Sequence, residues 1–382
     1  MQDTFDYLII GNGLAGLQLA LKLSKDPFFE SYKIGLIDPS DKTENDKTWS
    51  FWEKGEGKFD DVVEKVWHTA KFESPTISLR LPLKEYSYKT IRAIDFYNWT
   101  KNQLSIKDNF SFISDSVQTI EENAISKVIG LKNNYSANHV FDSRIPKEFR
   151  LHLSKHTLIH QHFKGWLIET DTPSFQPDAF TMMDYRFQYR DSTSFIYVLP
   201  FSETKALIEY TFFTPFTVEI QVYEEAIKEY LNQALNIEAY KILETEVGNI
   251  PMTDFPFWDY HTKNVTKIGT GGGWIKGSTG YSFKHTEKNV ARLIANIKSG
   301  KPPSKNMFKK KFKFYDKIFL KVLHDENEKG VWIFERFYSK NSIRTMFRFL
   351  DEETRFSEDL AIMKSLFSIA FIKAFFKVLF RF

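Results

Sequence analysis

The sequence predicts an α/β fold that begins with a β-α-β unit, on three observations. An apolar run at residues 7–10 is typical of a buried strand, and the sequence GNGLAG follows it directly. A helix over residues 17–23 is predicted to end before Pro27, and a second apolar strand covers residues 33–38. Another glycine-rich run, GTGGGWIKGSTGY, follows a late strand that ends at residues 267–269. A strand, a glycine-rich turn and a helix in this order are typical of Rossmann-like domains.

The first glycine-rich run has the spacing of a dinucleotide-binding turn. Gly11 permits the turn, Gly13 lets the backbone approach a pyrophosphate, and Gly16 lets the helix pack on the strand. The N-terminus of the helix would face the phosphates. Asp38 ends the second strand, roughly 20 residues after Gly16, and can hold the ribose hydroxyl groups. Together these residues predict a bound dinucleotide.

The second glycine-rich run favours FAD over NAD as this dinucleotide, because the long ribityl arm of FAD needs a second contact. A plain glycine loop is the alternative for this run. The residues that we expect to contact the cofactor are Gly11, Gly13, Leu14, Ala15, Gly16, Asp38, Trp49, Gly271, Gly272, Thr279 and Gly280.

Composition narrows the classes of protein to which the chain can belong. A length of 382 residues is enough for two or three domains. The net charge of +3 gives no reason to expect nucleic acid as a partner. The chain has no Cys, which excludes disulfides, iron–sulfur clusters and thiolate zinc sites. We expect neither a signal peptide nor a transmembrane helix, since no basic segment precedes an apolar one and no uncharged apolar stretch is long enough.

Aromatic residues make up 16% of the chain, and 38 residues are Phe. Such a composition fits a site for a large apolar ligand, although codon bias can produce it too. His156, His160 and His162 lie close together in the sequence, but no carboxylate pattern accompanies them. We therefore predict no metal site.

Short alternating segments predict a β-sheet in the middle of the chain. Residues 195–200 and 206–212 flank a turn at residues 202–205, as in a hairpin. A helix that is polar on one side is expected over residues 218–235, and another helix begins near Ser282.

The heptapeptide LIEYTFF, residues 207–213, places a carboxyl group among apolar side chains. Alternation along a strand separates Glu209 from its neighbours Ile208 and Tyr210, which share the other face. One interpretation is a solvated acid on an edge strand. The other is a buried acid, whose pKa would rise because burial disfavours the charged form.

The chain is basic and rich in Phe from about Pro302 onwards. Lys373, Lys377 and Arg381 recur at every fourth residue, so a helix would carry them on one face, with Phe and Leu over much of the rest. A helix of this kind can lie in a membrane interface. The alternative is a terminal helix packed on the protein with its basic stripe in water.

Ten motifs taken together resemble the lycopene cyclase family of FAD-dependent carotenoid enzymes, in particular the bacterial β-cyclases. They are GNGLAG (11–16), NDKTWSFW (45–52), IRAIDFYNW (91–99), QHFKGW (161–166), MMDYR (182–186), FIYVLPFS (195–202), LIEYTFF (207–213), GNIPM (248–252), STGYSF (278–283) and FRFLDEE (347–353).

The resemblance implies a flavoprotein fold with three parts. A Rossmann-like FAD-binding domain would comprise residues 1–165 and 246–300, and an inserted β-sheet domain for the substrate would comprise residues 166–245. A helical C-terminal region, residues 301–382, would end in an amphipathic membrane-associating tail. Family members work at membranes, which implies a peripheral position on the cytoplasmic side.

The resemblance also implies an activity, namely conversion of the linear ψ-ends of lycopene to β-ionone rings, giving β-carotene by way of γ-carotene. The reaction would be an acid-initiated carbocation cyclisation without net redox change. It would still require reduced FAD, with NAD(P)H as the expected source of electrons. Formation of ε-rings and cyclisation of only one end remain alternatives. So do a FAD-dependent isoprenoid reductase or monooxygenase of the same fold, and a carotenoid- or lipid-binding protein.

Two acidic residues are the candidates for catalysis. Glu209 falls at the position of the family's catalytic glutamate, which implies that it donates the proton. Asp184 could hold or deprotonate the substrate, or form a structural salt bridge with Arg186. Plant members have a second Glu where this chain has Tyr210, so the identity of the base stays open.

Two further features leave the flavin contacts open. Related monooxygenases have Gly-Asp where this chain has Gly269 and Thr270. Trp49, Trp52 and Trp166 could line the flavin or the substrate, or pack in the core.

Overall fold

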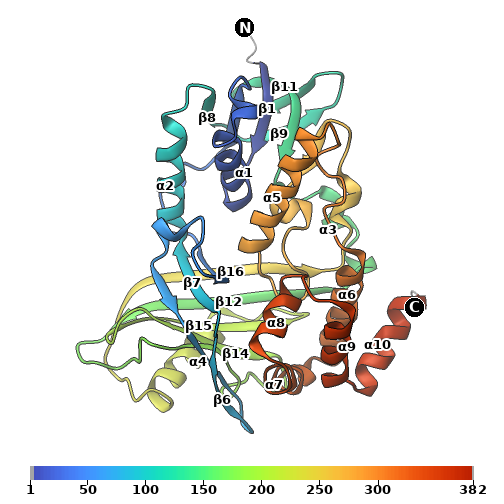
Figure 1. Ribbon diagram of the computed structural model, residues 1–382. Helices are drawn as coiled ribbons and strands as arrows, with labels where there is room; N and C mark the ends of the chain where they lie inside the picture. Colours follow the sequence, from blue (N-terminus) through green and yellow to red (C-terminus); the bar gives the residue numbers. More distant parts are fainter. Residues whose placement is uncertain (1–3, 381–382) are drawn as a thin grey trace.

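The computed structural model describes residues 4–380, which form three β-sheets and a C-terminal group of helices (Figure 1). The nucleotide-binding sheet lies in the upper part of Figure 1, and a larger sheet crosses beneath it. The C-terminal helices pack at one end of the larger sheet. Within this part of the chain, no helix is both long and apolar enough to cross a membrane.

The nucleotide-binding sheet has the strand order β8-β2-β1-β11-β10-β9, and β17 also pairs with β11. Its strands are β1 (Thr4–Ile10), β2 (Ile34–Asp38), β8 (Phe110–Ser114), β9 (Val117–Glu121), β10 (Ser126–Gly130), β11 (Asn134–Asp142) and β17 (Val265–Lys267). β8, β2, β1, β11 and β17 are parallel, and β9 and β10 extend the sheet in antiparallel fashion. β1 and β2 are almost continuously apolar because helices or further side chains cover both faces of a parallel sheet.

Three helices flank this sheet and fix its glycine-rich turn. α1 (Leu14–Ser24) follows β1 and packs against α2 (Ala93–Ser105) and α5 (Phe283–Lys298). Gly16 allows the close approach of α1 to the turn, because a Cβ atom there would lie 2.0 Å from the carbonyl oxygen of Gly11. The predicted Rossmann-like β-α-β unit is therefore confirmed, although the helix begins at Leu14, three residues earlier than expected.

The large sheet has the strand order β16-β12-β15-β14-β13-β5-β6. Its strands are β5 (Thr69–Glu73), β6 (Ser78–Pro82), β12 (Leu158–Glu169), β13 (Phe180–Asp184), β14 (Ser194–Pro200), β15 (Lys205–Thr214) and β16 (Lys241–Thr253). The helix α4 (Ile220–Gln233) packs on β12 and β15, and α6 (Lys310–Asp325) contacts β12, β15 and β16. The predicted hairpin is confirmed as β14 and β15, and the predicted helix as α4.

The large sheet does not coincide with residues 166–245, the range predicted for the substrate domain. The boundary between residues 165 and 166 falls inside β12, and the boundary between 245 and 246 falls inside β16. β5 and β6 join the same sheet from much earlier in the chain. Both long strands thus extend across the predicted junction of the two domains.

The remaining elements connect these units. A small sheet has the order β3-β7-β4 and consists of β3 (Thr48–Lys54), β4 (Lys65–Trp67) and β7 (Tyr86–Arg92). The short helix α3 (Lys147–Leu151) follows β11. The other C-terminal helices are α7 (Gly330–Lys340), α8 (Ile343–Leu350), α9 (Phe356–Ser365) and α10 (Ile369–Phe380). The helical C-terminal region is as predicted.

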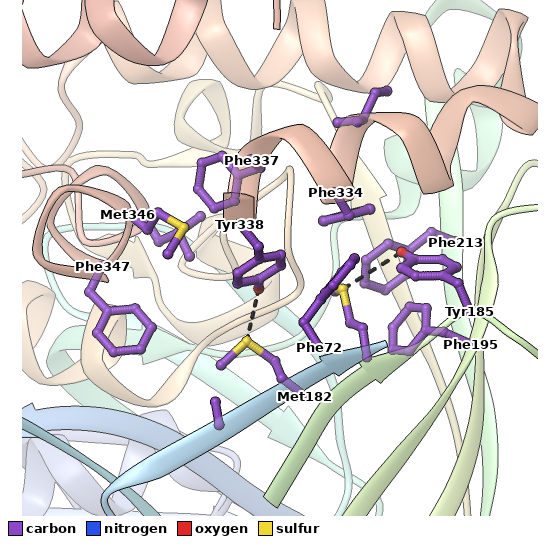
Figure 2. Packing of buried hydrophobic residues seen from close by; sticks show 14 of the residues in the cluster. Phe72, Met182, Tyr185, Phe195, Phe213, Phe334, Phe337, Tyr338, Met346 and Phe347 are labelled. Carbon is purple, nitrogen blue, oxygen red and sulfur yellow. Dashed lines mark hydrogen bonds between the residues drawn. The ribbon is translucent and has the colours of Figure 1, made fainter. Parts of the chain in front are cut away.

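A large apolar core joins the large sheet to the C-terminal helices (Figure 2). Met182 on β13 and Tyr338 on α7 meet within it, and the Tyr338 hydroxyl group donates to the Met182 sulfur at 2.8 Å. Phe195 and Phe213, on neighbouring strands, pack on the sheet side of the same cluster. The aromatic residues of this core hold the helices against the sheet.

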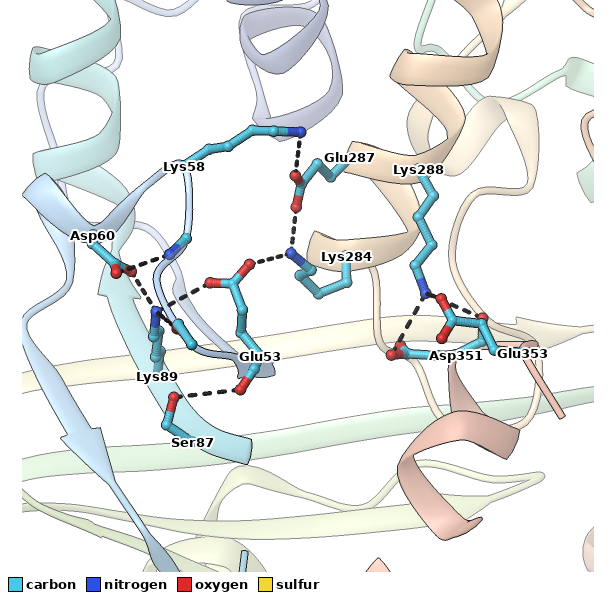
Figure 3. A network of polar contacts seen from close by, with 12 residues as sticks. Glu53, Lys58, Asp60, Ser87, Lys89, Lys284, Glu287, Lys288, Asp351 and Glu353 are labelled. Carbon is cyan, nitrogen blue, oxygen red and sulfur yellow. Dashed lines mark hydrogen bonds and ion pairs between the residues drawn. The ribbon is translucent and has the colours of Figure 1, made fainter. Parts of the chain in front are cut away.

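A network of charged side chains joins the small sheet to α5 (Figure 3). Lys284 on α5 contacts both Glu53 of β3 and Glu287, and Lys58 pairs with Glu287 at 2.7 Å. Lys89 of β7 reaches Glu53 from the other side, at 3.1 Å. Each buried or half-buried lysine in this network has a carboxylate partner, so the network connects the units without an uncompensated charge.

Candidate active site

A cavity of about 800 Å³ is bordered by both the nucleotide-binding unit and the large sheet. Its lining includes residues 13–16 at the start of α1, Trp49 of β3 and Glu209 of β15. Gly269 and Thr270, from the second glycine-rich run, also line it. One continuous cavity therefore joins the glycine-rich turn to the acid in LIEYTFF, although these lie far apart in the sequence.

The first glycine-rich turn is shaped by backbone that approaches its neighbours closely. Gly11 has a φ of 102°, and a Cβ atom there would lie 2.0 Å from the Ser143 hydroxyl oxygen. A Cβ atom at Gly13 would meet nothing within 4 Å, and Gly13 lines the cavity together with Leu14 and Ala15. The turn thus leaves open space beside Gly13, where a pyrophosphate would approach the helix N-terminus.

Asp38 lies beside this turn and supports it. Its carboxylate accepts hydrogen bonds from the backbone N–H groups of Asn12, at 2.7 Å, and Ser40, at 2.8 Å. Lys42 lies 3.7 Å from the same carboxylate. The described residues that line the cavity do not include Asp38 or Gly11. The contacts of Asp38 in this structure are therefore to the turn, and its role toward a ribose stays a prediction.

In the second glycine-rich run, Gly271 and Gly272 are packed, whereas Gly269, Thr270, Thr279 and Gly280 line the cavity. Residues 269–272 form a short 3-10 helix, and Cβ atoms at Gly271 and Gly272 would collide with the carbonyl oxygens of neighbouring segments. Gly280 has a φ of 72°, which favours glycine.

Two buried polar atoms beside this run lack partners within residues 4–380. They are the indole nitrogen of Trp274 and the side-chain oxygen of Gln161, and both residues line the cavity. Buried polar groups are normally hydrogen-bonded. One donor and one acceptor are thus available to a polar ligand next to the glycine-rich turns, a set that fits the many polar groups of a dinucleotide such as FAD.

Glu209 lines the same cavity from the large sheet. Its side chain is 9% exposed, and the Thr211 hydroxyl group donates to it at 2.5 Å. Burial, and next the charge of Glu246, raise the pKa of Glu209 to about 8, against the opposing effect of the Thr211 hydrogen bond. The acid is therefore protonated at neutral pH. It is buried in the middle of a seven-stranded sheet, not solvated on an edge strand.

Glu246 is a second acid in this wall that the sequence reasoning missed. Gly165 of β12 lies opposite Glu209 of β15 on one side and opposite Glu246 of β16 on the other. The backbone N–H of Thr48 donates to the Glu246 carboxylate at 3.0 Å, and burial raises the pKa of Glu246. The alternation of Glu244, Glu246 and glycine in the sequence could have signalled a strand face, but not which strand it pairs with.

Three tyrosines complete the wall around Glu209. Tyr197 of β14 lies directly opposite Glu209, and its hydroxyl group is 3.0 Å from that of Tyr88. The hydroxyl group of Tyr281 lies 3.4 Å from Tyr88 as well. All three line the cavity. The surroundings of the acid are thus aromatic, with neutral hydroxyl groups as the nearest polar partners.

Other residues singled out from the sequence lie elsewhere. Asp184 is fully buried in an ion pair with Arg186, which donates to it from Nε at 2.9 Å, and it is not among the described residues that line the cavity. Tyr210 lies on the face of the sheet covered by α4, where Trp166 also packs. Trp52 stacks on Phe347 in the core, whereas Trp49 lines the cavity. The contacts of Asp184 thus agree with the interpretation of a structural salt bridge with Arg186.

The histidines have ordinary hydrogen-bond partners. His160 contacts Asn249, and His162 contacts Tyr223 and Thr214. Among residues 4–380, no group of three or more His, Asp or Glu side chains is placed to hold a metal ion.

Comparison with known structures identifies the class of protein. Over 99% of this chain and 100% of the other, the fold matches a geranylgeranyl bacteriochlorophyll reductase-like protein from Thermoplasma acidophilum, with a TM-score of 0.61 and 10% identity. It also matches a flavoprotein/dehydrogenase from Cytophaga hutchinsonii over 99% and 100% of the two chains, with a TM-score of 0.59 and 12% identity. The halogenase PltM, solved in complex with FAD, matches over 98% and 90%, with a TM-score of 0.61 and 11% identity. The fold is that of the flavoproteins, as the sequence predicted.

The sequence then identifies the family within that class. The lycopene cyclase protein family matches residues 6–375, so the chain belongs to this family. A lycopene beta-cyclase from Paracoccus sp. (strain N81106 / MBIC 01143) is 32% identical over 155 residues. That alignment spans 39% of this chain and 39% of the relative.

Proposed function

We propose that this protein is a FAD-dependent lycopene cyclase that forms β-ionone rings from the ψ-ends of lycopene, and that Glu209 donates the proton that starts the reaction. The observation that carries the proposal is the position of Glu209. It is a buried acid, protonated near neutral pH, in one cavity with a dinucleotide-type turn. Family membership supports the substrate class, and burial keeps the carboxyl group protonated, so that it has a proton to donate to an alkene.

The proposed reaction is an isomerisation that leaves the elemental composition of the substrate unchanged. The terminal double bond takes the proton of Glu209, so that a C–H bond forms and a tertiary cation results. The electrons of the next suitably placed double bond close a six-membered ring and move the cation to a ring carbon. A proton then leaves a neighbouring ring carbon and gives the ring double bond. One proton enters and one leaves, so the reaction consumes no reductant.

The lining of the cavity supports a cationic intermediate. Phe195, Phe213, Phe334 and Phe337 line it from the core between sheet and helices. The face of an aromatic ring stabilises a nearby cation by roughly 0.5–2 kcal/mol. An apolar wall also excludes water, which would otherwise capture the cation as an alcohol.

The residues that would hold FAD are those that line the cavity at the two glycine-rich runs. Gly13, Leu14 and Ala15 would meet the pyrophosphate, and Trp274 and Gln161 offer their buried polar atoms. In its reduced form, with NAD(P)H as the source of electrons, the cofactor would supply negative charge near the developing cation. Gly13→Val would fill the open space beside the turn and is expected to lower FAD content at least tenfold, measured by absorbance of the purified protein.

The proposal is tested by expression in a bacterium that accumulates lycopene, followed by chromatography of the pigments. Conversion of lycopene to γ-carotene and β-carotene is expected. A product with an ε-ring would redirect the proposal to that ring type. Saturated products formed with stoichiometric loss of NAD(P)H would replace it with the isoprenoid reductase. Cyclisation at equal rates by oxidised and dithionite-reduced protein would contradict the need for reduced FAD.

We further propose that α9 and α10 bind the cytoplasmic surface of the membrane in which lycopene dissolves. α10 buries its small side chains, Ala370 and Ala374, against the protein. It leaves Ile369 70% and Phe376 50% exposed, and Phe367, just before it, is 70% exposed. A helix that served only to pack would bury the large apolar side chains, so this orientation favours an interfacial role.

The basic stripe predicted for this helix is only partly available to a membrane. Lys377 forms an ion pair with Asp325 at 2.7 Å, and Lys373 is exposed. Arg381 lies outside the described residues. Replacing Phe367 and Phe376 with Ser is expected to reduce binding to vesicles of anionic phospholipid in a flotation assay, while the melting temperature changes little. Unchanged binding would contradict this part of the proposal.

A further inference from the structure

Glu209 and Glu246 face one cavity from two strands that are not neighbours. Both lie opposite Gly165, which belongs to the strand between them. Residues opposite one another in antiparallel strands present their side chains to the same face. Gly165 has no side chain, so nothing from β12 stands between the two acids. The backbones are two strand spacings apart, about 10 Å, which two glutamate side chains can largely bridge.

Each carboxyl group is held by one neutral donor. The Thr211 hydroxyl group donates to Glu209, and the Thr48 backbone N–H donates to Glu246. Within residues 4–380, no lysine or arginine forms an ion pair with either acid. Two carboxyl groups in one poorly solvated site resist ionising together, so the loss of a proton from one makes its loss from the other harder.

We propose that Glu246 is a positioning residue for proton transfer, whose carboxylate, fixed by Thr48, faces Glu209 across Gly165 and keeps Glu209 protonated until substrate arrives. The inference rests on the proposed cyclase function. Tyr210, the sequence neighbour of Glu209, lies on the other face of the sheet and cannot act as a second acid in the cavity. The second acid of the site, Glu246, comes from β16, further along the chain.

The remaining groups that face the pair do not replace this effect. Tyr197 of β14 and Tyr281, just before α5, face Glu209 and stay neutral at working pH. Lys47 and Asp46, which precede β3, face Glu246 and act on it in opposite directions. After burial, the charge of Glu246 has the largest effect on the pKa of Glu209, and it raises that pKa.

The test compares pH profiles of cyclisation by FAD-loaded protein in detergent with lycopene. In the wild type, activity should fall as Glu209 ionises, near pH 8. Glu246→Gln keeps the size of the side chain and an acceptor for Thr48 but removes the charge. We expect its alkaline limb to move to lower pH by about one unit. Glu246→Asp keeps a charge, set further back, and should lie between wild type and Glu246→Gln.

The matched control is Glu244→Gln. Glu244 has the same side chain on the same strand, two residues away, but it contacts Arg92 and Asn45 and is not among the described lining residues. Its profile should overlay that of the wild type. If the activity of Glu246→Gln declines at the same alkaline pH as that of the wild type, the inference is overturned, whatever the maximum activity of the variant. Should that variant not fold, an unmoved limb in Glu246→Asp would overturn it equally.

A second readout separates this inference from the proposed function. The pH dependence of the melting temperature reports the ionisation of Glu209 without substrate. The difference between wild type and Glu209→Gln, measured from pH 5 to 9, should shrink when Glu246→Gln is present in both. If that coupling appears in a protein without cyclase activity, the proposed cyclase function is wrong, but the proposed interaction of Glu246 with Glu209 is supported. If cyclase activity is present and the coupling is absent, the role of Glu246 is wrong.

Discussion

Two groups of buried or half-buried acids in this protein differ in whether a cation is paired with them. Near the second glycine-rich run, Asp316 and Glu352 surround Lys276, whose Nζ lies 2.8 Å and 3.6 Å from their carboxylate oxygens. In the cavity wall, Glu209 and Glu246 have no such cation within the described residues. In the first group a lysine compensates the charge of the acids, whereas in the second Glu209 keeps its proton beside the charge of Glu246.

The difference fits a structural role for the Lys276 cluster and the proposed catalytic role for the acids in the cavity wall. Lys276 is 2% exposed, and its backbone carbonyl accepts from Gly280 at 2.9 Å, so the ion pairs fix the turn that lines the cavity. A cation beside Glu209 would lower its pKa and leave no proton to donate. Among the described residues, the absence of a cation paired with Glu209 therefore fits the proposed reaction, whereas the Lys276 cluster fixes the turn.

The largest effect should come from removing the proton of the acid pair. Glu209→Gln keeps the volume of the side chain and should reduce cyclisation by at least about 10²-fold, the lower range for loss of a general acid. Pigment chromatography in lycopene-accumulating cells measures this, with FAD content as a control for folding. A variant that retains full activity would remove Glu209 from the mechanism.

Breaking the Lys276 cluster should instead cost stability. Lys276→Met leaves Asp316 and Glu352 without their shared cation and is expected to lower the free energy of unfolding by about 3–5 kcal/mol. Denaturant titration measures the loss. Arg80→Met, which breaks the exposed pair with Asp178, is the control and should change stability by less than about 1 kcal/mol. Equal effects of the two variants would erase the distinction between a buried cluster and a surface pair.

The acid pair should make stability depend on pH in a defined direction. The pKa of Glu209 is higher in the folded protein than in the unfolded chain, so its contribution is complete below about pH 4.5 and is lost as pH rises to about 8. Glu209→Gln removes this loss. Its melting temperature should gain on that of the wild type between pH 5 and pH 8, corresponding to a few kcal/mol at most, on the order of 1.4 kcal/mol for each unit of pKa difference. A constant difference would mean that Glu209 ionises normally.

The smallest effect is expected from Gly165→Ala. The added methyl group would lie 3.2 Å from Leu207 and 3.4 Å from the Cβ atom of Glu209, so the neighbours must move by a few tenths of an ångström. Stability should fall by about 1 kcal/mol or less, while the methyl group intrudes between the two acids. We expect activity to fall severalfold with FAD content unchanged. Activity equal to that of the wild type would indicate that the gap at Gly165 is not needed.

The sequence correctly predicted those parts of the fold that depend on residues close together in the chain. The turn at Gly11, Gly13 and Gly16 lies within one β-α-β unit, where Gly16 packs against the carbonyl oxygen of Gly11, so the spacing of the glycines was enough to predict it. The hairpin of β14 and β15 depends on a short loop and alternation. The start of α1 was placed too late because Gly16, although a glycine, belongs to the helix.

The burial of Glu209 could not be predicted from the sequence pattern alone. Its residue type and apolar neighbours allowed both a solvated acid on an edge strand and a buried acid. Because β15 pairs with β12 on one side and β14 on the other, Glu209 lies on an inner strand and is buried. Asp184, by contrast, forms an ion pair with Arg186, a partner only two residues further along the chain.

By itself, the sequence determined the family, the nucleotide-type turn and the candidate acid, because each is recognised from short motifs without knowing how distant segments pack. The tertiary structure alone decided that Glu246 accompanies Glu209, that the Lys276 cluster supports the second glycine-rich run, and that α10 exposes its large apolar side chains. These depend on strand order and on the face that a helix presents. Both are set by packing between segments more than 30 residues apart, which no local pattern records.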